Sequence, residues 1–186
     1  MPLFFVNLQK IQYTQMKKII SILFMLSLSL SILAQGRIDK FYGMSFGLSR
    51  SQIEDVLTSK GKTVKWKSNS QGKTYAKCYK NISIAGGTFD EASFFYNSSG
   101  LYSGNFSFGF DRFSKSQCQS LYNLVLTSLL SKYGNPQITT STSSTWNLSN
   151  GKITLKIVSY NAGDGNGTRT ETILSYSNVS VDKSDF

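Results

Sequence analysis

The sequence predicts an α+β protein built from two units, each a helix followed by a three-stranded antiparallel meander (α-β-β-β), with the helix packed on one face of its sheet. Two segments repeat apolar residues with the period of an amphipathic helix, and the segments between them alternate apolar and polar residues with period two. Aromatic residues make up 13% of the 186 residues, and the chain has only two prolines. Aromatic and β-branched side chains suit the half-buried surface of a pleated sheet, which favours this class over a helical bundle.

The first predicted helix begins at Ser49 or Ser51 and ends at Lys60. Ser51 and Glu54 have the spacing of a capping box, in which two side chains satisfy free groups at the start of a helix. Gly61 follows the helix and is a typical stop signal. Three apolar residues recur on one face, namely Ile53, Val56 and Leu57.

The second predicted helix begins at Ser114 or Ser116 and ends at Lys132, before Gly134 and Pro136. Its apolar positions have the i, i+3, i+4, i+7 spacing of a helix that covers a core. This stripe consists of Cys118, Leu121, Tyr122, Val125 and Leu129.

The predicted strands are short alternating segments separated by polar turns. In chain order they are 63–67, 73–84, 89–96, 101–110, 144–148, 152–160 and 168–176. The segment Asn97–Gly100 is a strong hairpin signal, because asparagine, serine and glycine accept the backbone angles of tight turns.

The two predicted helices open with similar motifs. Residues 49–52 read SRSQ and residues 114–117 read SKSQ, and each helix is followed by a tryptophan strand, at Trp66 and at Trp146. This echo predicts an internal tandem repeat, with coincidence in a serine-rich chain as the alternative. The predicted domains are a signal peptide at 1–34, a first α-β repeat at 35–112 and a second at 113–186.

The N-terminal region predicts export. Met16 precedes two lysines, an apolar run over 19–33 and Ala34, which is the arrangement of a secretory signal peptide. An uncleaved anchor is the alternative, but the run is short for a membrane span of roughly 20 apolar residues. We expect the true start at Met16, cleavage after Ala34, no membrane span in the mature form, and a secreted or periplasmic bacterial protein.

The residues that enter the first predicted helix resemble a known motif. Gly43, Met44 and Ser45, within the segment 42–49, resemble the entry motif of the β-lactamase-inhibitor-protein-like fold, which the small outer-membrane lipoprotein A (BamE) group shares. The resemblance implies a helix followed by an antiparallel sheet, used twice over residues 40–178, and allows inhibition of an extracellular enzyme. The chain has no cysteine at the signal cut, so a lipid anchor is not expected. It also differs from that fold in having no cysteine pair within each repeat.

Residues for catalysis are scarce. The chain has no histidine, which excludes the Ser-His-Asp and Cys-His arrangements and removes the commonest metal ligand. The ten acidic residues are scattered, although folding could bring two of them together as in a glycosidase. The glycine-rich segment 164–167 lacks the closing acid of a calcium loop. We expect no enzyme, no cofactor and no metal.

Two cysteines, Cys78 and Cys118, remain after removal of the signal peptide. Both fall on inward positions of the predicted elements, and an exported protein meets an oxidising compartment. A disulfide between them and two separate buried thiols therefore both stay open, because the geometry of a disulfide cannot be read from sequence.

A run of lysines gives the best functional signal. No acid occurs between Asp55 and Asp90, and this interval contains Lys60, Lys62, Lys65, Lys67, Lys73, Lys77 and Lys80. Alternation puts part of this run, together with two tyrosines, on the outer face of a hairpin. These residues are Lys65, Lys67, Lys73, Tyr75, Lys77 and Tyr79.

Lysines interleaved with tyrosines suit acidic partners. The sequence thus predicts an exported non-catalytic protein that binds a protein or a polyanionic ligand through this face, without specific nucleic-acid recognition. The alternatives are an inhibitor of an extracellular enzyme and a hydrolase of envelope polymers. The lysines could also serve only to protect an edge strand from aggregation.

Overall fold

The computed structural model describes residues 36–70, 72–109, 114–161 and 168–178, which belong to one compact unit. The predicted signal peptide with its start at Met16, and the glycine-rich segment 164–167, lie outside the described residues.

The described residues contain two helices and eight strands. The helices are α2 (Arg50–Ser59) and α3 (Lys115–Tyr133). The first four strands are β1 (Lys65–Ser68), β2 (Thr74–Ile84), β3 (Gly87–Asn97) and β4 (Gly100–Phe108). The last four are β5 (Ile138–Thr140), β6 (Ser143–Leu148), β7 (Gly151–Asn161) and β8 (Thr168–Asn178).

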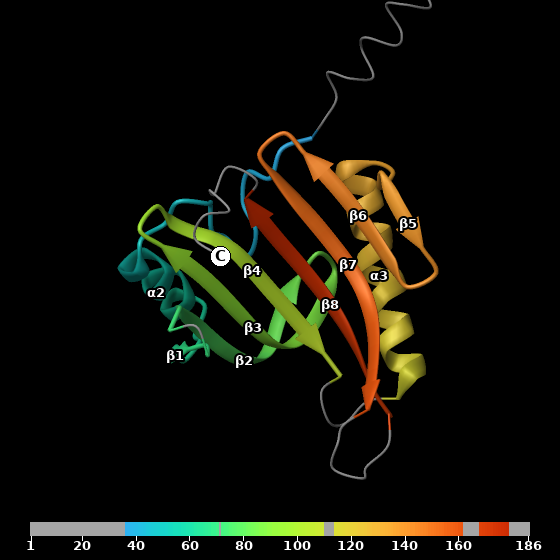
Figure 1. Ribbon diagram of the computed structural model, residues 1–186, viewed down its shortest axis with the longest axis horizontal. Helices are drawn as coiled ribbons and strands as arrows, with labels where there is room; N and C mark the ends of the chain where they lie inside the picture. The colour runs from blue at the N-terminus through green and yellow to red at the C-terminus, as the bar shows by residue number, and fades with distance from the viewer. Residues whose placement is uncertain (1–35, 71, 110–113, 162–167, 179–186) are drawn as a thin grey trace, which may run out of the picture. The chain divides into compact units, whose positions relative to one another are not determined.

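All eight strands form one antiparallel sheet in the order β1-β2-β3-β4-β8-β7-β6-β5 (Figure 1). The predicted fold class, two helix-plus-three-strand units, was therefore wrong, because the described residues form mostly one eight-stranded antiparallel sheet with two helices. Strand β4 pairs with β8, so that Phe106 lies opposite Leu174 and the strands of both halves of the chain belong to one sheet. The short edge strand β5 was not predicted, because three exposed residues give no alternation to detect.

Both helices begin with the same cap. The backbone N–H of Ser49 donates to Gln52 Oε1 at 2.9 Å, and the N–H of Gln52 donates to Ser49 Oγ at 3.4 Å. Ser114 and Gln117 repeat this pattern at α3. The predicted box of Ser51 with Glu54 was wrong, because the helix begins one residue after Ser49 and glutamine completes the box.

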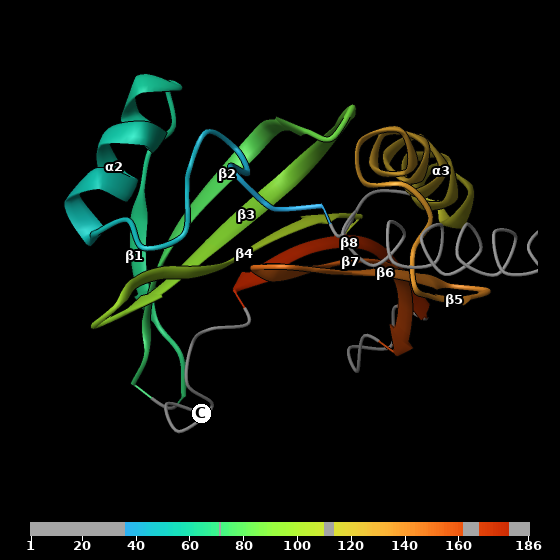
Figure 2. The ribbon, with the colours of Figure 1, turned by 90° about the horizontal axis from the view of Figure 1, so that it is seen from above.

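Both helices lie on the same side of the sheet (Figure 2). One hydrophobic core joins Ile53 and Leu57 of α2 and Val125 and Leu129 of α3 to the inward residues of the strands. The largest of these inward side chains are Phe89, Phe94, Phe106, Trp146 and Tyr176. Neither helix covers the opposite side of the sheet, so alternate residues of each strand face away from the core.

Helix α3 comes very close to β3 at Gly87. A Cβ at this position would lie 2.6 Å from Leu121 Cδ1 and 2.7 Å from Val125 Cγ2. These distances are far below van der Waals contact, so only glycine allows the strand to pass beneath the helix at this separation.

Replacing this glycine should destabilise the protein by overpacking. We expect Gly87→Ala to lower the free energy of unfolding by about 1–3 kcal/mol, measured by chemical denaturation. The matched control is Gly36→Ala, whose Cβ would meet Tyr133 and Leu148 at ordinary contact distances of 3.5 and 3.6 Å. That control should change stability by less than about 0.5 kcal/mol, and equal effects of the two variants would contradict the close approach.

Candidate basic-aromatic sheet face

The register of β1 and β2 brings the predicted lysines and tyrosines side by side. Lys65 lies opposite Lys77 and Lys67 opposite Tyr75, while their chain neighbours Trp66 and Ala76 face the core. Alternation along the chain places Lys73 and Tyr79 on the same side as Tyr75. We call this set the basic-aromatic face: Lys65, Lys67, Lys73, Tyr75, Lys77 and Tyr79.

One lysine of this face is neutralised by an ion pair. Lys77 Nζ lies 2.7 Å from Glu91 Oε1, and the two side chains are only 17% and 29% exposed. Burial lowers the pKa of Lys77, but the hydrogen bond and the charge of Glu91 outweigh it, and the pKa is raised overall. Sequence reasoning missed Glu91 as a partner, because only the register of β2 against β3 brings it beside this lysine.

Two lysines that face each other across strands would normally repel and weaken the sheet. Here both ammonium groups lie over the ring of Tyr79. Lys65 Nζ is 5.7 Å and Lys77 Nζ 5.3 Å from the ring centroid. The electron-rich ring face and the Glu91 carboxylate offset the repulsion, since both attract cations. Tyr79 therefore helps to stabilise the two neighbouring positive charges of the face.

Aromatic rings extend this face onto two further strands. Tyr75 stacks on Phe95 of β3 with centroids 5.0 Å apart, and Phe95 contacts Tyr102 of β4 at 6.4 Å. We call Tyr75, Phe95 and Tyr102 the aromatic row. The alternation of β3 puts Phe95 on the outer side with Glu91, so the sequence alone could have predicted that Phe95 belongs to this face.

The side chains of two other lysines of the basic run have structural roles, and a third lysine accepts a hydrogen bond through its backbone carbonyl. Lys62 Nζ donates to the carbonyl oxygens of Lys80 and Asn81, each at 3.0 Å. Those two residues have positive φ angles of 63° and 53° at the bulge between β2 and β3. Lys60 Nζ lies 4.9 Å from the ring centroid of Tyr42. The charge available to a partner is thus smaller than the lysine count of the sequence.

Cys78 and Cys118 are both buried and free. Burial raises the pKa of the Cys78 thiol to about 11. The Cys118 thiol donates to the carbonyl oxygen of Thr170 at 3.2 Å, and burial raises its pKa as well. Of the two arrangements that the sequence left open, the structure shows the separate buried thiols.

Within the ranges that the structure describes, no group of three histidine, cysteine or acidic side chains could hold a metal ion. No helix in these ranges has the length and hydropathy needed to cross a bilayer. No known protein family, curated protein or solved structure matches the chain. The face offers cationic groups that suit negative charge and flat rings that suit planar or apolar groups.

The free thiols make a prediction about chemical reactivity. Because both thiols are buried and protonated near neutral pH, we expect neither to react with Ellman's reagent at pH 8 in the native protein. Unfolding the protein in guanidinium without reductant should expose two reactive thiols. Rapid labelling of the folded protein, or no thiol after unfolding, would contradict this arrangement, the latter by revealing a disulfide.

Proposed function

We propose that this chain is an exported, non-catalytic binding protein that recognises an acidic protein or an anionic polymer through its basic-aromatic face. One observation carries the proposal: the register that pairs Lys65 with Lys77 and Lys67 with Tyr75 on the side of the sheet that neither helix covers. Export rests on the signal-like segment 16–36, and the absence of histidine argues against most nucleophilic catalysis.

The charge of the face supports an acidic partner. Lys65 and Lys67 are exposed, and no acid occurs in the sequence between Asp55 and Asp90. Glu91 neutralises Lys77 and leaves the surrounding lysines in excess. Clusters of one charge sign attract oppositely charged partners over a Debye length of about 10 Å at moderate salt.

The aromatic row supports binding over simple solubility. Lysines that only protect an edge strand need no neighbouring rings, whereas Tyr75, Phe95 and Tyr102 form a half-buried chain across three strands. Tyrosine and phenylalanine offer large contact areas with little side-chain entropy to lose, and aromatic residues are enriched at interfaces for this reason.

Removing the lysines should weaken binding to a polyanion. We expect the variant with Lys65, Lys67, Lys73 and Lys77 all changed to Gln to elute from a heparin column at clearly lower salt. The slope of log affinity against log salt should fall by roughly 2 to 3, because each lost contact releases about one counterion fewer.

A matched control removes the same charge from other parts of the molecule. Lys40 lies in the N-terminal segment, Lys60 follows α2, and Lys115 and Lys132 belong to α3. Changing all four to Gln should shift elution much less. Equal shifts for the two variants would mean that net charge alone governs retention. Unchanged retention of the first variant would overturn the proposal.

The ion pair of Lys77 predicts a variant that binds more tightly. We expect Glu91→Gln to delay elution from heparin, because it frees Lys77 and removes a negative charge beside the face. Asp39→Asn makes the same change of charge at an exposed pair with Arg37 and should delay elution less. Earlier elution of Glu91→Gln would show that the carboxylate positions Lys77 for binding, contrary to this prediction.

A further inference from the structure

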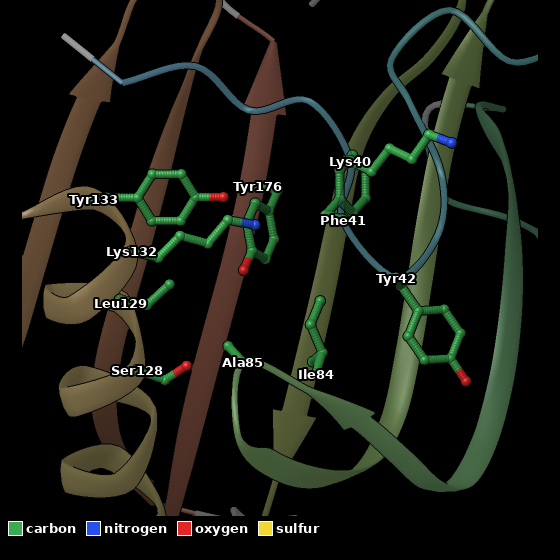
Figure 3. Close-up of a pocket in the computed structure, with 10 residues that line it drawn as sticks. All are labelled: Lys40, Phe41, Tyr42, Ile84, Ala85, Ser128, Leu129, Lys132, Tyr133 and Tyr176. Atoms are coloured by element: carbon green, nitrogen blue, oxygen red, sulfur yellow. The ribbon is translucent and has the colours of Figure 1, made fainter. Parts of the chain in front are cut away.

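A cavity of about 150 Å³ opens on the helix side of the sheet, on the face opposite the basic-aromatic face. Four parts of the chain line it: the segment 40–42, the end of β2 with the turn after it, the last turns of α3 and Tyr176 of β8 (Figure 3). Ile84 ends β2, and the turn that follows contributes Ala85 and continues with two glycines, so no side chain larger than a methyl group from the turn fills the space.

The polar groups of the cavity come mainly from α3. Ser128 and Lys132 lie one turn apart, and Tyr133 follows Lys132. Figure 3 shows Lys132 and Tyr133 reaching from the helix toward Tyr176, whereas the Lys40 amine and the Tyr42 hydroxyl point away. Lys132 Nζ lies 5.1 Å from the ring centroid of Tyr133, so the two side chains stay close together at the mouth.

The inner part of the cavity is apolar and aromatic. Phe41 stacks on Tyr176 with centroids 5.1 Å apart and planes nearly parallel, and Leu129 is fully buried beside them. Tyr176 itself is only 3% exposed, and burial raises the pKa of its phenol, so the hydroxyl keeps its proton at neutral pH. The walls therefore offer apolar surface together with phenol groups that can donate hydrogen bonds.

The positive charge of Lys132 at the mouth of the cavity has no carboxylate partner among the described residues. None of the described residues that line the cavity carries a carboxylate, and Lys132 forms no ion pair with any acid in the described ranges. An exposed ammonium at the rim attracts an anion and repels a cation, and a carboxylate is its ordinary partner.

We propose that this cavity binds a small amphiphilic anion, with an apolar body about the size of a benzene ring inside and one carboxylate held at the mouth by Lys132 and Tyr133. The size follows from the volume, since a cavity near 150 Å³ accommodates one benzene ring. The site lies on the other side of the sheet from the basic-aromatic face and does not depend on the function proposed for that face.

Benzoate is the probe that matches this description, and benzyl alcohol and benzylamine are its neutral and cationic counterparts. In amide NMR spectra of the protein, we expect benzoate to shift the signals of residues 84–85 and 129–133 with a Kd below about 1 mM. Benzyl alcohol and benzylamine should bind at least tenfold more weakly.

Four variants test the assignment. Lys132→Met should weaken benzoate binding at least tenfold, and Ser128→Leu should abolish it by filling the cavity. Lys152→Met, a matched change at an exposed lysine of β7, should leave it unchanged, as should the loss of Lys65, Lys67, Lys73 and Lys77. The proposal is overturned if benzoate causes no shifts at 10 mM, if benzyl alcohol binds equally well, or if Lys132→Met binds as the unchanged protein does.

Discussion

The antiparallel pairing of β4 with β8 joins the strands of the first and second halves of the chain into one sheet. Phe106 lies at this junction opposite Leu174. The centroid of its ring lies 5.7–6.1 Å from the ring centroids of Phe89, Phe94 and Tyr176. Because the ladder is continuous, one side of the sheet is buried under both helices and the other side meets solvent. The proposed surface and the cavity both depend on this division, since they lie on opposite sides.

The basic-aromatic face shows that a count of lysines overstates the charge a partner would meet. Lys77 is paired with Glu91, and Lys62 is committed to two backbone carbonyls at a bulge. What remains is a smaller cationic area with ordered rings beside it. Tyr79 lets Lys65 and Lys77 lie opposite each other because its ring face attracts both ammonium groups.

The cavity is assembled from segments far apart in the sequence. The turn after β2 approaches α3 closely, and a Cβ on Gly86 would lie 3.5 Å from Ser128 Cβ. Phe41 reaches the same place from the N-terminal segment and stacks on Tyr176 of the last strand. Since the two candidate sites occupy different faces of the sheet, both can be filled in the same molecule.

The sequence by itself determined the local structure. Helical periodicity located α2 and α3, and alternation located seven of the eight strands and the outward side of Lys65 and Lys67. These features follow from chain geometry, because the periods of 3.6 and 2 act over a few neighbouring residues. The capping residue Gln52 was missed because Ser49 with Gln52 and Ser51 with Glu54 have the same three-residue spacing, and both glutamine and glutamate fit the motif.

Only the tertiary structure decided which strands pair. The contact of β4 with β8 joins residues about seventy positions apart, and no local pattern distinguishes this edge from another. The ion pair of Lys77 with Glu91 and the walls of the cavity also depend on which strands and helices lie next to each other. Burial of the shared core selects the partners, because apolar surface is removed from water most completely when both helices cover one continuous sheet.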